Sequence, residues 1–343
     1  MRRCRRRRAV AFRFGCQNSR FSLSSKRPAG IGQNENMNLK DKLVHASVPV
    51  ILFEMVPPAA HKPEALETAL ADVKKIRHLV DAINLPEIHD ENRGGDRTHK
   101  FVERVEPRKL AARIQREAEA EVVINRCVVY EPDQAAWFRE SHETYGIQHA
   151  ILVGSESSAI RYPGPSVLEA VTELKSKGMA LTLGGITIPS RLHEADRIRR
   201  KHAAGISFFT TQVLFDSNDI VSLIQRLNGL DARIFLSFAP VSHERDVAFL
   251  RWLGADVPKD LDRFLIQGDS QSASRAGAGG AASGRSLDLA QRILMDVFDN
   301  LPPDPPLLGL NIEHINRRNF SPAIRMVERL GNLYANLVAS RAG

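Results

Sequence analysis

Eight short, β-rich apolar segments alternate with helical segments from residue 48 onward, and this alternation limits the possible fold more than any other feature. The segments with strand composition are 48–56, 82–88, 120–130, 149–154, 180–188, 206–215, 232–241 and 307–315. Between them, stretches such as 63–80, 166–177 and 219–229 place apolar residues at the i, i+3, i+4 spacing of a helix with one buried face. The strand segments are continuous apolar runs, which is typical of a parallel sheet covered by helices.

Eight strand–helix units predict a closed (β/α)8 TIM barrel that forms one domain over residues 37–343. A doubly wound open sheet is the alternative, but it usually has fewer strands, and no strong phosphate-binding loop follows the first strand here. Residues 268–286 are small and polar, so we expect a flexible surface loop there. Gly277-x-Gly279-x-x-Ala282 in this segment resembles a dinucleotide fingerprint, but no strand precedes it, and we assign it no function.

The net charge of +8 is concentrated at the N-terminus. Residues 1–36 hold nine Arg and one Lys against a single acid, a net +9, which leaves −1 for the other 307 residues. The near-neutral body argues against a nucleic-acid partner. The Arg- and Ser-rich extension fits an organelle transit peptide, a basic arm, or untranslated sequence ahead of a true start at Met37. In each case we expect it to be disordered and outside the fold.

Cysteine content and hydropathy indicate the cellular compartment of the protein. Cys127 is the only cysteine outside the N-terminal extension, so the body has no disulfide and fits a reducing compartment. No apolar run approaches the roughly 18 residues that a membrane span needs. We therefore expect a cytoplasmic protein with no membrane partner, or a mitochondrial one if the extension is a transit peptide.

Polar residues at the ends of the predicted strands are the candidate functional residues, because a TIM barrel builds its site from strand ends and the loops after them. Glu54 is the most conspicuous, since it follows three apolar residues in "ILFEMVPP". A carboxyl group there has a raised pKa and can hold a proton near neutral pH, although an outward-facing Glu54 paired with a helix residue is the alternative. The other candidates are Glu87, His89, Asn125, Arg126, Ser155, Glu156, Thr211, Gln212, Ser242, His243, Glu313, His314, Asn316 and Arg317.

A metal site is not expected from these residues. His89, Asp90 and Glu91 have suitable side chains, but three adjacent residues on a loop do not present three ligands to one ion.

Five motifs occur in order along the chain, at or near predicted strand ends. They are "FEMVPP" at 53–58, "KHAAG" at 201–205, "TTQVLFD" at 210–216, "FAPVS" at 238–242 and "INRRNFSPAI" at 315–324. Together they resemble the motifs of the 5,10-methylenetetrahydrofolate reductases, and they extend over nearly the whole body of the chain.

The resemblance implies a (β/α)8 barrel with FAD that reduces 5,10-methylenetetrahydrofolate to 5-methyltetrahydrofolate with NAD(P)H as co-substrate. Glu54 would be the general acid that helps to open the five-membered ring of the folate. Gln212 would hydrogen-bond the pterin, and Asn316 and Arg317 would lie near the bound folate or nicotinamide. We also expect a homo-oligomer.

The flavin-binding part of the family pattern is less complete. Gly154 and Ser155 stand where the family has R-G-D beside the isoalloxazine ring, and Glu194 and Lys201 would meet the FAD phosphates and ribose. The family motifs D-x-T-x-G, H-x-T-C and Y-P-E are replaced by other residues.

Three functions are therefore open. The first is a divergent reductase that passes hydride through FAD or directly from the nicotinamide. The second is a pterin- or folate-binding barrel of another class, such as a one-carbon or methyl transferase. The third is a non-catalytic partner subunit, against which Glu54 and Gln212 argue, because a purely structural barrel does not need both.

Overall fold

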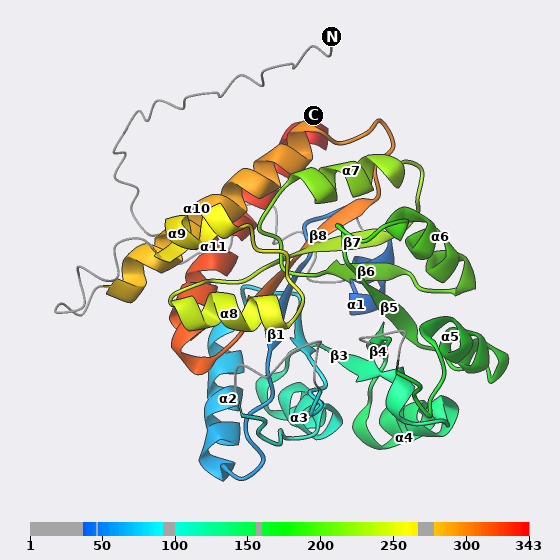
Figure 1. Cartoon of the computed structure of the whole chain (residues 1–343). Helices are drawn as coiled ribbons and strands as arrows, with labels where there is room; N and C mark the ends of the chain where they lie inside the picture. Colours follow the sequence, from blue (N-terminus) through cyan, green and yellow to red (C-terminus); the bar gives the residue numbers. More distant parts are fainter. Residues whose placement is uncertain (1–36, 46, 92–99, 156–159, 267–277, 343) are drawn as a thin grey trace, which may run out of the picture.

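The predicted barrel is confirmed. The computed structural model describes residues 37–342, except 46, 92–99, 156–159 and 267–277. Eight parallel strands close into a barrel in sequence order, and helices surround it (Figure 1). The N-terminal extension, residues 1–36, lies outside the described residues. Within the described ranges, no helix combines the length and apolar character needed to cross a membrane.

Each strand lies inside its predicted segment. The strands are β1 (Ile51–Met55), β2 (Ala82–Leu85), β3 (Val122–Cys127), β4 (His149–Val153), β5 (Thr182–Thr187), β6 (Phe208–Thr211), β7 (Arg233–Phe238) and β8 (Leu307–His314). They are shorter than predicted, because apolar residues at their ends continue into loops. After β1, for example, Pro57 and Pro58 have no amide hydrogen to donate to a neighbouring strand.

One helix precedes β1, at least one helix follows each strand, and three lie between β7 and β8. They are α1 (Leu39–Val44), α2 (Pro63–Ile76), α3 (Pro107–Arg113), α4 (Gln134–Tyr145), α5 (Val167–Ser176), α6 (Glu194–Ala204), α7 (Asn218–Arg226), α8 (Glu244–Trp252), α9 (Lys259–Ile266), α10 (Ala278–Asp299) and α11 (Phe320–Ala342). Local sequence sets several ends: Ser166 and Glu169 form a reciprocal capping box at the start of α5. Gly146 ends α4 at φ 69°, where glycine is favoured.

An apolar layer fills the N-terminal part of the barrel. Inward-facing residues of the strands pack here with two leucines of α1: Leu39, Leu43, Leu52, Ala82, Val123, Ile151, Phe208 and Phe235. Two glycines make room for the phenylalanine rings. A Cβ on Gly184 would lie 2.4 Å from the Phe208 ring, and one on Gly309 would lie 2.5 Å from the Phe235 ring. The barrel interior is therefore a packed core at this end.

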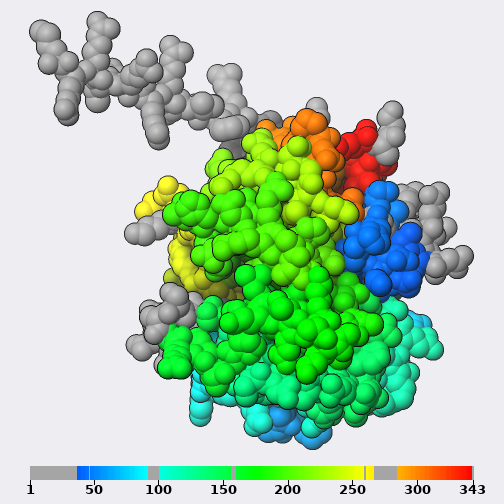
Figure 2. Space-filling view, turned by 90° about the vertical axis from the view of Figure 1, so that its right-hand side faces the viewer, coloured from blue at the N-terminus to red at the C-terminus, as the bar shows by residue number. Residues whose placement is uncertain are grey.

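A polar layer follows the apolar one. Two residues farther along their strands, where side chains again face inward, lie Glu54, Asn84, Asn125, Ser237 and Asn311. The helices in the middle of the chain, coloured green, form a continuous outer surface, and the described chain begins in blue at its edge (Figure 2).

The predicted flexible loop over 268–286 is partly wrong. Residues 278–286 belong to α10, which lies beside α11, while 267–277 lie outside the described residues. Two contacts hold this part of the helix. The Ser286 hydroxyl accepts a hydrogen bond from the Val241 amide at 3.2 Å, and Arg285 donates to the Leu265 carbonyl. Small-residue composition alone does not reveal such contacts.

Candidate functional site

Glu54 faces the interior of the barrel. Its Oε2 accepts a hydrogen bond from Asn84 Nδ2 at 2.8 Å and lies 3.3 Å from Asn311 Nδ2. These donors come from β2 and β8, the two strands that pair with β1. The outward-facing alternative for Glu54 is therefore excluded, and the residue lies in the polar layer.

A second carboxyl group stands beside it. Glu313 of β8 is the direct sheet partner of Glu54, and both side chains are half-buried at the barrel mouth. Burial raises the pKa of Glu54 to about 7. Burial and the neighbouring charge of Glu54 raise the pKa of Glu313 well above its usual value. Two neighbouring carboxyl groups with raised pKa values favour the protonated form near neutral pH, so the pair can act as an acid there.

Buried amides surround this pair. Asn311 Nδ2 also lies 3.1 Å from Ser237 Oγ, which links β8 to β7. The Oδ1 atoms of Asn84, Asn125 and Asn311 are buried and accept no hydrogen bond within the part of the chain that the structure describes. A bound molecule with N–H donors, or ordered water, would satisfy these oxygens.

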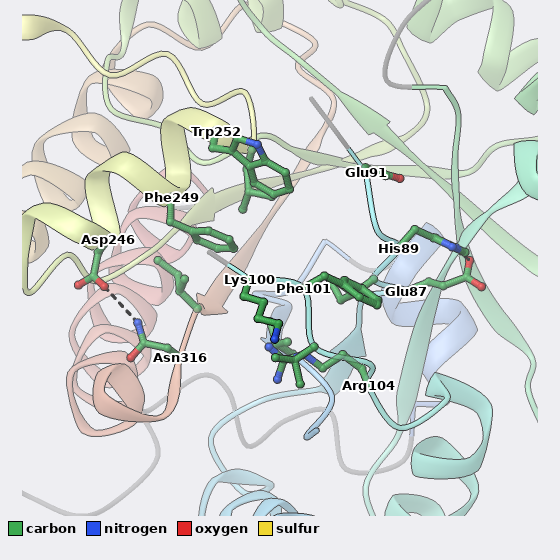
Figure 3. Close-up of a pocket in the computed structure, with 15 residues that line it drawn as sticks. Glu87, His89, Glu91, Lys100, Phe101, Arg104, Asp246, Phe249, Trp252 and Asn316 are labelled. Carbon is green, nitrogen blue, oxygen red and sulfur yellow. Dashed lines mark hydrogen bonds and ion pairs between the residues drawn. The ribbon is translucent and has the colours of Figure 1, made fainter. Parts of the chain in front are cut away.

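A cavity of about 190 Å³ opens at the carboxyl ends of the strands. Val56, two residues beyond Glu54 on the same chain, lines it, whereas Glu54 and Glu313 do not. Figure 3 shows Phe249 and Trp252 on one side of the cavity and Glu87 and His89 on the other. The remaining lining residues are Ile88, Glu91, Lys100, Phe101, Val102, Arg104, Asp246, Leu253, Ile315 and Asn316.

The cavity combines an aromatic wall with positive charge. The rings of Phe249 and Trp252 are stacked, with centroids 6.1 Å apart and planes at 23°. Lys100 and Arg104 lie in the central part of the view in Figure 3. Aromatic faces bind flat ring systems, and Lys and Arg bind carboxylates, so the lining suits a flat molecule with an anionic tail.

Asp246 holds one wall of the cavity together. Its carboxylate accepts hydrogen bonds from the amides of Ser242 and His243 and from the side chains of Asn316 and Asn319. It thereby ties the start of α8 to the turn after β8. The Asp246–Asn316 contact is 3.1 Å long and is drawn in Figure 3. Asn316, a predicted substrate-binding residue, thus lies on the cavity wall.

The other two predicted substrate contacts lie elsewhere. Arg317 is exposed in the short helical turn after Asn316 and lines neither cavity described here. Gln212 lines a second cavity of about 130 Å³ at the ends of β5 and β6, and its Nε2 donates to the Leu253 carbonyl at 2.7 Å. Leu253 lines the first cavity and Gly254 the second, so the end of α8 separates them.

Neither cavity is lined by the residues that the resemblance assigns to FAD, which are Gly154, Ser155, Glu194 and Lys201. Glu194 is buried, and its carboxylate accepts a hydrogen bond from the Ile188 amide. Lys201 Nζ donates to the Ile186 carbonyl at 2.8 Å, and burial lowers its pKa. These contacts tie α6 to the chain around β5 and use both side chains in the packing of the fold, which does not favour them as flavin ligands. FAD binding stays an untested prediction.

Asn84 and Asn311 of the polar layer were not predicted as site residues, although the sequence contains a signal for both. Asn84 is the single polar residue of β2, and Asn311 follows four apolar or glycine residues in β8, two positions before Glu313. Both have the inward-facing position of Glu54, and the pattern that identified Glu54 would have identified them. Phe249 and Trp252 carried no such signal, because aromatic residues on an amphipathic helix usually pack against the core.

The chain was compared with known proteins. The sequence matches no protein-family model and no curated protein. Its structure is similar to that of an uncharacterized protein from Clostridium thermocellum that binds two copies of 5-methyl-5,6,7,8-tetrahydrofolic acid. The TM-score is 0.60 at 15% sequence identity, over 82% of this chain and 95% of the other. At this identity the likeness shows that the two chains share a barrel fold.

Proposed function

We propose that this chain binds a reduced folate at the carboxyl end of its barrel, with the pterin ring toward the polar layer. The observation that carries the proposal is the Glu54–Glu313 pair, which retains a proton near neutral pH among amides with unsatisfied oxygens. A pterin offers N–H donors for the oxygens of Asn84 and Asn311 and ring nitrogens for an acid. The folate ligand of the similar structure supports the same ligand class.

The cavity supplies contacts for the rest of the molecule. The aromatic wall of Phe249 and Trp252 suits the benzoyl ring of a folate. Lys100 and Arg104 suit the carboxylates of its glutamate tail. This orientation puts the flat head inside and the charged tail toward solvent.

The reaction that we propose is reduction of 5,10-methylenetetrahydrofolate to 5-methyltetrahydrofolate by NAD(P)H. Opening the five-membered ring breaks a bond between the methylene carbon and a nitrogen, and the electron pair stays on that nitrogen, which takes a proton. Protonated Glu54 supplies the proton, and an iminium group remains on the other nitrogen. Hydride from the nicotinamide then adds to the methylene carbon, which forms the methyl group. Direct hydride transfer is the route proposed, because the residues assigned to FAD do not fit it.

A second candidate is a one-carbon or methyl transferase. The observation that favours it is the second cavity, which the end of α8 separates from the first and which offers space for another substrate. In that case Glu54 would donate its proton to the folate nitrogen from which the one-carbon unit leaves.

Binding and turnover measurements test the proposal. Calorimetric titration with 5-methyltetrahydrofolate tests folate binding, and the loss of NAD(P)H absorbance with 5,10-methylenetetrahydrofolate tests reduction. Glu54→Gln should still bind the folate but lower turnover by roughly 10²–10⁴-fold, the usual contribution of a general acid. The control is Glu143→Gln, an exposed carboxylate on α4. Absence of folate binding would contradict the proposal; binding without NAD(P)H oxidation would favour the second candidate.

A further inference from the structure

Glu87, His89 and Cys127 come together where β2 and β3 end. One ligand atom from each side chain lies within 4.8 Å of the others. His89 Nε2 is 3.3 Å from Glu87 Oε2. Glu87 and His89 lie two and four positions beyond the end of β2, and Cys127 ends the neighbouring strand β3.

We propose that these three residues bind a divalent transition-metal ion, with zinc as the best match. Thiolate, imidazole and carboxylate are the ligands that zinc takes in proteins. With bonds of about 2.0–2.3 Å in a tetrahedral site, neighbouring ligand atoms lie about 3.3–3.8 Å apart. The His89–Glu87 distance already has this value, and the contacts to Cys127 need to shorten by at most about 1 Å, which rotation of side chains provides.

Neighbouring hydrogen-bond donors hold the Glu87 carboxylate in a fixed position beside the other two ligands. Arg126 Nη1 donates to Glu87 Oε1 at 2.8 Å, and the Cys127 amide donates to Oε2 at 2.7 Å. These two donors hold the carboxylate in position, as partners of metal ligands commonly do.

Arg126 does not leave the site positively charged. Its guanidinium also contacts Glu131 at 3.0 Å, so one cation is shared by two carboxylates. Glu91 lies close by and accepts a hydrogen bond from the Tyr130 hydroxyl, and the Tyr130 ring stacks on His89. Glu91 and Glu131 therefore place negative charge beside the three ligands and offset Arg126, which favours a divalent cation, although Lys100 and Arg104 line the same cavity.

The position of the cluster indicates an ion with an open coordination site. Glu87 and His89 line the first cavity, side by side in Figure 3, whereas Cys127 is buried and does not line it. Three protein ligands leave the fourth position of a tetrahedral ion toward the cavity, as in catalytic zinc sites. A water molecule or an anionic atom of a substrate would occupy it. This metal site does not depend on the proposed folate function.

Cobalt(II) and zinc(II) are the probes for the test. The full-length protein is stripped with a chelator, checked for folding by circular dichroism, and titrated with Co²⁺ by absorbance and with Zn²⁺ by calorimetry. We expect one ion per chain, the visible bands of tetrahedral cobalt, and a thiolate-to-cobalt charge-transfer band. Cys127→Ser should abolish the charge-transfer band, and His89→Gln should weaken binding at least about tenfold.

Matched controls separate this site from other thiols and histidines. Because Cys4 and Cys16 also offer thiols, the double variant Cys4→Ser with Cys16→Ser should retain the band. His61→Ala, at an exposed position, should retain full affinity. The proposal is overturned if the folded wild-type protein binds no stoichiometric ion, or if the band survives Cys127→Ser. If Cys127→Ser does not fold, unchanged affinity in His89→Gln overturns it as well.

Discussion

A Glu54→Gln substitution is expected to stabilise the folded chain at pH 8 and to have little effect on stability at pH 4.5. The cause is the pKa of Glu54, which burial raises from 4.5 to about 7 in the folded state. Below pH 4.5 the folded and unfolded chains both hold the proton. Between pH 4.5 and 7 the unfolded chain releases it while the folded chain retains it, so the free energy of unfolding falls as the pH rises.

The magnitude follows from the size of this shift. A displacement of about 2.5 pKa units corresponds to about 3 kcal/mol of unfolding free energy, lost in full above pH 7. Glutamine cannot ionise, so the variant does not lose this energy. It keeps a side-chain oxygen to accept the hydrogen bond from Asn84, and it removes the charge that helps to raise the pKa of Glu313. At pH 8 the melting temperature should rise by roughly 5–10 °C.

Urea unfolding at several pH values between 4.5 and 8 provides the measurement. The quantity of interest is the difference in unfolding free energy between variant and wild type, because titrating groups that the substitution does not affect cancel from it. Glu313 does not cancel: it loses the neighbouring charge that helps to raise its pKa, which adds to the stabilisation of the variant at high pH. This difference should grow with pH and level off above pH 7. Glu143→Gln should give a flat, near-zero difference. A flat difference for Glu54→Gln would refute the assignment of a raised pKa to this carboxyl group.

Two further substitutions test the barrel core and the cavity wall. Gly309→Ala places a Cβ 2.5 Å from the Phe235 ring and should lower the unfolding free energy by about 1–3 kcal/mol in urea unfolding, whereas Phe235→Leu in the same chain should recover part of the loss. No loss in Gly309→Ala would contradict the described packing. Trp252→Ala should weaken calorimetric binding of 5-methyltetrahydrofolate about tenfold, or about 1.4 kcal/mol, and Trp252→Phe should bind nearly as well as wild type. If both Trp252 variants bound 5-methyltetrahydrofolate with equal affinity, the aromatic wall of Phe249 and Trp252 would not be part of the binding site.

The strands were predictable because each one is buried on both faces and therefore appears as an apolar run in the sequence. Glu54 was predictable for the same reason, since a carboxyl group in such a run is conspicuous. The proximity of Glu87 and Cys127 was not, because it depends on which residues of β2 and β3 lie side by side. The error at the start of α10 has a similar origin: contacts such as that of Ser286 with Val241 stabilise the helix, and local composition does not record them.

The apolar layer and α1 have a kinetic consequence. They fill the N-terminal part of the barrel with Leu39, Leu43 and the strand residues they contact, so a ligand in the polar layer has no passage through that end. Any ligand of the polar layer must then enter and leave through the same opening at the carboxyl end. A molecule bound against Glu54 would be covered by any second molecule seated above it. Such a one-ended chamber favours compulsory binding order, with the inner ligand first to arrive and last to depart.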